Sequence, residues 1–322
     1  MEKKKVLKII ITLSILIIVY FTLDGKIVNA IKSISRPFYI FISLLIPTFL
    51  IPIIVNNRWK VFLEIQGIQE NFFSLVKINF ISIFLGFLLP SSTGFDAVRI
   101  YIIEKKHKEK LGSGGAAVVI ERILGFYLLS LMAIVGSFVA YYNGTGISVV
   151  YLSIIINILI TLGILFLRSK FLFKSISKKL DRIKILKKIS GYLNKLYSSI
   201  NSFPIKSTIL VTIPLILLFQ LSCVFCVFLL FKSFNLQIPF FYHLAFLPLI
   251  LIIAIIPVSI SGFGLREGGF VFFYGLIGID GNVAFLVSLL YYAVLMLVPA
   301  TIGMIIYLFS GEAKNYQNEL KS

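Results

Sequence analysis

The sequence predicts an all-α membrane protein, a polytopic helical bundle with about six full spans and two re-entrant helical hairpins. These eight helical hydrophobic units are expected to form an inverted-topology repeat. Of the 322 residues, 59% are hydrophobic, and the mean hydropathy is +1.01, which no soluble domain shows. Apolar runs long enough to cross a bilayer recur along the chain. Two of them are interrupted by short stretches rich in Pro, Gly and Ser.

The first apolar run, residues 6–23, follows the basic stretch Met1-Glu-Lys-Lys-Lys5. It is longer than a signal-peptide core, and no small-residue cleavage site follows it. We therefore expect an uncleaved first span that starts in the cytoplasm. The other apolar segments lie near residues 38–55, 72–90, 114–141, 147–167, 207–231, 240–260, 268–279 and 282–309.

The two interrupted segments decide the predicted topology. If 72–103 enters from the cytoplasm, breaks at 90–94 and returns, the basic cluster 105–110 stays inside, as the positive-inside rule prefers. The segment 240–279 is expected to do the same from the outside, so that helix 282–309 ends in the cytoplasm. Irregular backbone at this depth is tolerated only where protein or a water-filled cavity covers it.

The basic residues are distributed unevenly under this topology. Lys and Arg number 31 against 13 Asp and Glu. Those predicted to lie outside are Lys26, Lys32, Arg36 and Lys232, and those at membrane depth are Lys77, Arg99, Arg122 and Arg266. The others are assigned to the cytoplasm, with Arg58 and Lys60 among them. We expect a multi-pass protein of the cell membrane with both termini cytoplasmic, whose basic residues face anionic membrane lipids and not nucleic acid.

The chain is predicted to be a single integral membrane domain over 1–322, with repeat halves 1–141 and 147–309. Chance similarity between two broken helices is the alternative to a repeat. Residues 168–206 read as a basic amphipathic connector on the cytoplasmic leaflet, because apolar residues recur every three or four positions opposite Lys and Arg. Docking of a partner is the alternative role for this segment.

Two stretches look like copies of one device, with Pro and Arg at the same spacing: Pro90-Ser-Ser-Thr-Gly-Phe-Asp-Ala-Val-Arg99 and Pro257-Val-Ser-Ile-Ser-Gly-Phe-Gly-Leu-Arg266. Paired Gly/Pro-interrupted segments are the best sequence pointer to a transporter's binding site. The glycines leave peptide N–H groups able to face an anion, and the serines add hydroxyl donors. The candidate residues of this kind are Gly94, Ser92, Ser259, Gly262 and Gly264.

Charged side chains at membrane depth complete the candidate site. They are Asp96 and Arg99 in the first hairpin, Glu121 and Arg122 in the following helix, and Arg266 and Glu267 in the second hairpin. In one interpretation, buried ion pairs pin two hairpins to a helix. In the other, the arginines receive an anionic group, since the planar guanidinium donates two parallel hydrogen bonds to phosphate. Both hold if binding exchanges carboxylate for phosphate. The acids are also candidates for binding a proton or an amino-bearing head group.

At these residues the chain resembles a known family. The segments Thr93-Gly-Phe-Asp-Ala-Val-Arg99, Glu121-Arg122 and Ser261-Gly-Phe-Gly-Leu-Arg-Glu-Gly268 are similar to motifs of the lysylphosphatidylglycerol synthase transmembrane region, also called the flippase-like domain family. The family pattern has Gly-Gly-Asp at residues 94–96 and Gly-Gly at residues 261–262, where this chain differs. The resemblance implies a stand-alone translocation module without the aminoacyl-transferase domain of two-domain members.

The leading hypothesis is therefore a lipid flippase for an anionic, aminoacyl-phosphatidylglycerol-like phospholipid or a polyprenyl-phosphate-linked lipid. The alternatives are a membrane enzyme acting on a lipid phosphate, and a membrane partner of a glycosyltransferase. A homo-oligomer or a synthase partner stays open. Catalytic residues, metals and cofactors are not expected, because no nucleotide-binding motif occurs and Cys223 and Cys226 read as core side chains.

Overall fold

The computed structural model describes residues 27–89, 94–168, 195, 197–200, 205–256, 259 and 262–310. The predicted first span 6–23 and most of the connector 168–206 lie outside these described residues. Within the described part the chain is helical, without strands, which confirms the predicted fold class. Its candidate membrane spans are Phe38–Ile65, Ser113–Tyr142, Ser148–Leu165, Leu210–Ser233 and Gly281–Phe309.

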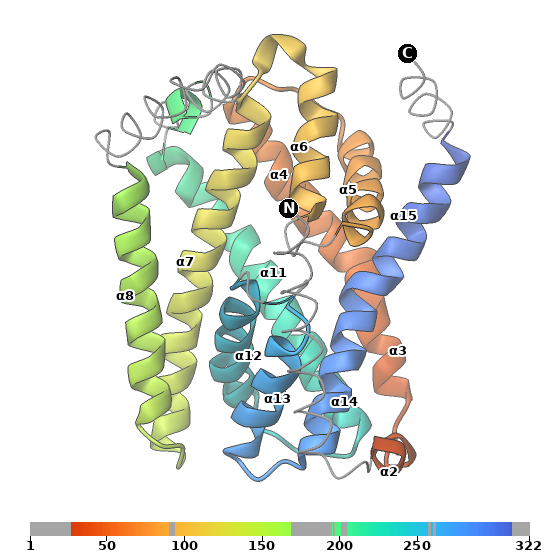
Figure 1. Cartoon of the computed structure of the whole chain (residues 1–322), viewed down its shortest axis with the longest axis vertical. Coiled ribbons are helices and arrows are strands. Elements are labelled where there is room, and N and C mark those ends of the chain that lie inside the picture. Colours follow the sequence, from red (N-terminus) through yellow and green to blue (C-terminus); the bar gives the residue numbers. More distant parts are fainter. Residues whose placement is uncertain are drawn as a thin grey trace, which may run out of the picture.

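The long helices form the frame of the bundle (Figure 1). They are α7 (Ser113–Tyr142), α8 (Ser148–Arg168) and α11 (Ile205–Ser233). The short α2 (Ile27–Lys32) precedes them in the chain. Two further spans each contain a π-helical turn. The first consists of α3 (Phe38–Leu45), η1 (Ile46–Leu50) and α4 (Ile51–Ile65). The second consists of α14 (Gly281–Tyr292), η4 (Ala293–Leu297) and α15 (Val298–Phe309). Pro47 lies in the first of these turns and Pro299 lies in α15 just after the second, and each removes a backbone N–H from the regular helical ladder.

Two pairs of half-length helices fill opposite ends of this frame. The first hairpin is α5 (Phe72–Phe87) with α6 (Gly94–Lys106), and the second is α12 (Phe240–Ile255) with α13 (Leu265–Gly275). The first occupies the upper half of Figure 1 and the second the lower half. The hairpins pack against α15 and α7 respectively. This is the arrangement predicted for hairpins that enter from opposite sides, and the inverted repeat itself stays a prediction.

The two helices of the first hairpin approach each other closely because glycines lie where they meet. A Cβ on Gly86 would lie 2.3 Å from the backbone nitrogen of Phe95, and one on Gly94 would lie 2.8 Å from the Gly86 carbonyl oxygen. At the other end of α5, the Asn71 side chain accepts from the Phe73 N–H at 3.1 Å and caps the helix. These glycines let α5 and α6 approach closely enough to return to the same face.

The second hairpin turns through left-handed backbone. Gly262 and Gly264 have φ of +75° and +86°, a conformation that only glycine adopts without strain. The carboxylate of Glu267 accepts a hydrogen bond of 2.6 Å from the Gly264 N–H at the start of α13. The sequence signal of Gly at these positions therefore marks the turn itself, and Glu267 caps the helix that follows it.

Hydrogen bonds link neighbouring segments at each end of the bundle. At the upper end of Figure 1, Gln66 donates to the Ser199 carbonyl at 3.1 Å. At the lower end, Tyr242 donates to the Asn143 carbonyl at 2.9 Å, and the Arg36 N–H donates to the Ser233 carbonyl at 2.9 Å. The basic turn 105–110 and the C-terminal end of α15 both lie at the upper end (Figure 1). The predicted topology placed these two segments on the same side of the membrane.

A carboxylate joins the first hairpin to the loop before it at the upper end. Glu70 accepts from Lys106 and is hydrogen-bonded to the His107 ring at 2.8 Å. Burial alone would raise the pKa of Glu70, but these bonds, with one to Ser74, outweigh burial and hold its pKa below the usual value. Nearby, Glu104 of α6 accepts from the N–H groups of Gly112 and Gly115, which begin α7.

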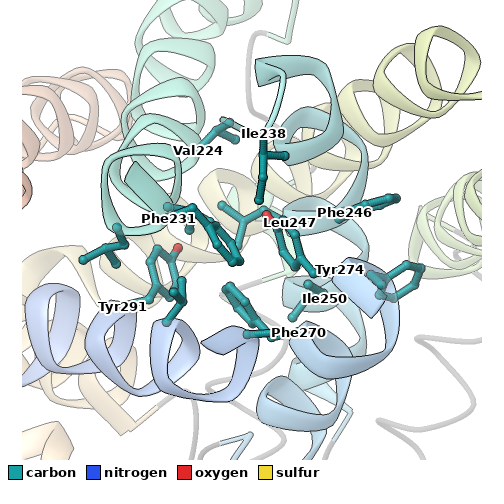
Figure 2. Close-up of a cluster of buried hydrophobic side chains, with 14 of the residues drawn as sticks. Val224, Phe231, Ile238, Phe246, Leu247, Ile250, Phe270, Tyr274 and Tyr291 are labelled. Carbon is teal, nitrogen blue, oxygen red and sulfur yellow. The ribbon is translucent and has the colours of Figure 1, made fainter. Parts of the chain in front are cut away.

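The largest buried apolar cluster surrounds the second hairpin (Figure 2). It joins α11, α12, α13 and α14 through Val224, Phe231, Phe246, Leu247, Ile250, Phe270, Tyr274 and Tyr291. The rings of Phe231 and Tyr274 lie 4.3 Å apart, and the Tyr274 hydroxyl is hydrogen-bonded to His243 at 2.8 Å. Such packing joins the second hairpin to α11 and α14 in the lower half.

Substitution of Gly303 tests the close packing of the first hairpin against α15. A Cβ at this position would lie 2.0 Å from the backbone oxygen of Phe80. The backbones of α5 and α15 would therefore have to move apart to accommodate an alanine. We expect Gly303→Ala to lower the free energy of unfolding by about 1–3 kcal/mol, measured as a lower melting temperature in detergent. Gly163→Ala on α8 is the control, because no atom lies within 4 Å of its Cβ. Equal melting temperatures for both variants would contradict the close contact.

Candidate functional site

A cavity of about 350 Å³ lies between the two hairpins. The first hairpin contributes Phe87 and Phe95 to its wall, and the second contributes Leu251, Ile255 and Arg266. Most of the lining side chains are apolar. The polar and ionisable ones are Arg58, Asn79, Glu121, Arg122, Gln220, Cys223, Arg266, Tyr291 and Tyr292. The cavity therefore combines hydrocarbon walls with a small number of charged groups.

Five charged side chains form one network beside this cavity, which we call the arginine network. Arg58 donates to Glu121 Oε1 from Nε at 3.0 Å and from Nη2. Arg99 Nη2 donates to Glu121 Oε2 at 2.9 Å and to Asp96 Oδ1 at 3.2 Å. Arg122 Nε donates to Asp96 Oδ2 at 2.7 Å. The network joins α4, α6 and α7, so these ion pairs do pin the first hairpin to its neighbours.

The two ends of the network differ in exposure. The Arg99 side chain is 2% exposed, and its guanidinium lies 4.6 Å over the Trp59 ring. The Arg122 side chain is 38% exposed, lies 4.8 Å over the Phe95 ring and faces the cavity. Aromatic faces stabilise guanidinium groups away from water. Arg99 is therefore a buried linking group, and Arg122 is the part of the network open to a ligand.

The second hairpin contributes another guanidinium, that of Arg266, to the lining of the same cavity. Arg266 Nη2 is paired with Glu267 Oε1, and its Nε donates to the Ser288 hydroxyl at 3.3 Å. The Arg266 guanidinium lies 4.3 Å over the Tyr292 ring. Because Glu267 also caps α13 at Gly264, the pair holds Arg266 at a fixed place next to the turn.

The predicted site residues separate into three groups. Arg122, Glu121 and Arg266 line the cavity. Arg99, Asp96 and Glu267 lie directly behind them, bonded to these groups. Gly94, Gly262 and Gly264 build the turns, while Ser259 is buried without a hydrogen-bond partner for its hydroxyl among the described residues. Ser92 lies outside the described residues.

The assignment of Arg58 to a cytoplasmic segment was wrong. Arg58 lies inside the span Phe38–Ile65, where it is 7% exposed and bonded to Glu121. The polar run that contains it reads as the end of a span, yet the helix continues to Ile65. The apolar pair Phe62 and Leu63, both buried, is the signal that could have shown this. Sequence reasoning also missed Asn79, Gln220 and Tyr292, which carry no distinctive pattern.

The cysteines behave as expected. Cys223 and Cys226 are buried free thiols on α11, and Cys223 reaches the cavity wall. In the part of the chain that the structure describes, His, Cys, Asp and Glu side chains form no group of three or more that could hold a metal ion.

Comparison with known proteins supports the family suggested by these motifs. The family model described as the lysylphosphatidylglycerol synthase TM region matches residues 5–303. The chain belongs to this family. It is 27% identical over 321 residues to UPF0104 membrane protein MJ1595 of Methanocaldococcus jannaschii, with 94% of each chain covered. It is 24% identical over 218 residues to UPF0104 membrane protein MJ1078 of the same organism, covering 65% of this chain and 86% of that one. No solved structure gives a significant match.

The arginine network predicts unequal costs for two neighbouring substitutions. Glu121→Gln leaves Arg58 and Arg99 buried without a shared carboxylate, so we expect the free energy of unfolding to fall by about 3–5 kcal/mol. Arg122→Gln removes a partly exposed group, and Asp96 keeps its bond to Arg99. We expect this variant to unfold within a few degrees of the wild type. Thermal unfolding in detergent measures both, and a larger loss for Arg122→Gln would show that the network is not centred on Glu121.

Proposed function

We propose that the protein is a lipid translocase that moves a lipid with a phosphate-bearing anionic head group between the leaflets of the cell membrane. Arg122 and Arg266 would hold the phosphate. The observation that carries this proposal is the cavity, where the guanidinium groups of Arg122 and Arg266, together with the Glu121-bound Arg58, line an otherwise mostly apolar chamber between two half-length hairpins. A charged side chain inside a membrane bundle marks a pathway or a ligand site by default.

The two arginines depend on different hairpins. Arg122 is bonded to Asp96 of the first hairpin, whereas Arg266 belongs to the second. Movement of either hairpin would therefore change access to the phosphate from one end of the bundle only. Guanidinium groups suit this role because their forked donors match phosphate oxygens, and their charge does not depend on pH. Alternate opening of hairpins around a fixed site is the usual logic of such transporters.

A shallow apolar groove favours a lipid over a water-soluble anion. It lies among α7, α8 and α12, and it shares Phe126 and Ile255 with the central cavity. Its other lining residues are Ile123, Ile160, Gly163, Ile164 and Ile252. The adjoining face of α8 exposes Leu159 and Leu162. A lipid bound here could place its hydrocarbon chain in this groove, in reach of the surrounding bilayer, while its head group stayed in the cavity.

The basic end of the bundle is proposed to face the cytoplasm. It carries the turn 105–110 and the helix ends that border the connector 168–206. The lower end carries Lys32, Arg36 and Lys232 among its described residues. The positive-inside rule then directs the first hairpin inward and the second outward. The family's name refers to a synthase of an aminoacylated phospholipid, which supports a phospholipid cargo.

Substitution of the cavity arginines tests the proposed function. We expect Arg122→Ala and Arg266→Ala each to slow the flipping of an acyl-labelled fluorescent phosphatidylglycerol in proteoliposomes by about tenfold or more. Lys at either position should restore only part of the rate, because the fork is lost. Arg36→Ala, at an exposed position on the lower end, is the matched control. Wild-type rates in both cavity variants, with the fold intact, would contradict the proposal.

A second variant tests the groove. Gly163→Phe would fill the groove without touching the charged residues, because the space around its Cβ is open. We expect the variant to fold normally and to slow flipping several-fold. Gly275→Phe is the control, since its Cβ also meets no atom within 4 Å and it lies outside the groove. Equal flipping by both variants would exclude the groove as the path of the hydrocarbon chain.

A further inference from the structure

We propose that the cavity selects lipids whose head group carries one net negative charge, and that Arg122 sets this preference. The inference rests on the proposed function and narrows its cargo to a phosphodiester without a balancing amine. It is based on the balance of charge around the cavity and on the hydrogen bonds that the carboxylate oxygens there already accept from the protein.

The charges around the cavity do not cancel. The arginine network contains three guanidinium groups and two carboxylates, namely Arg58, Arg99 and Arg122 with Asp96 and Glu121. The pair of Arg266 and Glu267 is balanced. The hairpin residues outside the description, 90–93, 257–258 and 260–261, are uncharged. The described residues that form or directly support the charged part of the wall therefore carry one surplus positive charge.

The surplus charge is presented to the cavity by Arg122. Arg58 uses Nε and Nη2 on Glu121, and Arg99 is almost fully buried between two carboxylates. Arg122 uses only Nε in its bond to Asp96, so its two terminal amino groups have no hydrogen-bond acceptor among the described residues. Its partly exposed guanidinium keeps an edge of parallel donors for a phosphate.

A single negative charge matches this surplus. Unbalanced charge in an apolar interior is costly, and a monoanionic phosphodiester would bring the group to neutrality. A diphosphate or an ionised phosphomonoester would leave excess negative charge. A zwitterionic head group would leave the positive charge uncompensated, and its ammonium group would need an acceptor of its own.

The carboxylates offer little to such an ammonium group. Both oxygens of Asp96 accept from Arg99 and Arg122, and both of Glu121 accept from Arg58 and Arg99. Those of Glu267 accept from Arg266 and from the Gly264 N–H. Each oxygen thus already accepts a hydrogen bond from the protein, and guanidinium groups already balance the negative charge of all three acids. This argues against the acids as a site for an amino-bearing head group, which the sequence alone had left open.

The test compares fluorescent lipids with identical acyl chains in wild-type proteoliposomes. The probes are phosphatidylglycerol with one negative charge, zwitterionic phosphatidylethanolamine, cationic lysyl-phosphatidylglycerol and phosphatidic acid at pH 8.5. We expect phosphatidylglycerol to flip about tenfold faster than each of the others, which corresponds to about 1.4 kcal/mol. Equal rates, or a faster rate for any of the other three, would overturn the inference and leave the proposed function standing. No flipping of any probe above protein-free vesicles would overturn the proposed function itself.

Arg122→Gln provides the second arm. It removes the surplus charge, so we expect the rate for phosphatidylglycerol to fall to that for phosphatidylethanolamine, while the latter changes little. Arg122→Lys keeps the charge and should keep the order of the four probes at reduced rates. A preserved tenfold preference in Arg122→Gln would show that Arg122 does not set the selectivity. The wild-type comparison decides the charge preference even if a variant fails to fold.

Discussion

The carboxylate of Glu121 is the group on which the upper half of the bundle depends. It lies in a mostly apolar interior and is shared by Arg58 of α4 and Arg99 of α6, so it joins two helices to α7. An unpaired charge at this depth would cost several kcal/mol, which makes the three helices interdependent. The same bonds leave Arg122 at the edge of the network, held at Nε and open towards the cavity. One set of interactions thus supports the first hairpin and places a donor for an anion.

The cavity owes its position to the hairpins. Each covers only half the height of the bundle, and they come from opposite ends, so their tips border a chamber that neither fills (Figure 1). Close approach at Gly86 lets α5 and α6 pack together, and left-handed backbone at Gly262 leads into α13, which packs against α12. The apolar wall and the adjoining groove then suit a molecule with a charged head and a hydrocarbon tail. This combination, more than any single arginine, distinguishes the site from a buried ion pair.

Much of this could be predicted from the sequence, because membrane helices are encoded by local composition. Long apolar runs predicted the spans, and the Pro/Gly breaks predicted both hairpins and most of the charged residues beside the cavity. Arg58 could not be assigned in the same way. Its polar neighbours look like the end of a span, and only three-dimensional packing shows that α4 continues and turns Arg58 towards Glu121. The charge balance of the cavity changes with that one residue.

The described residues that form the charged part of the cavity wall carry one surplus positive charge, which a monoanionic lipid is proposed to neutralise. Native mass spectrometry of the protein released from nanodiscs of equal phosphatidylglycerol and phosphatidylethanolamine measures this directly. We expect one phosphatidylglycerol to be retained per chain in the wild type and to be lost in Arg122→Gln. Retention of phosphatidylethanolamine in its place, or equal retention of phosphatidylglycerol by both proteins, would contradict it.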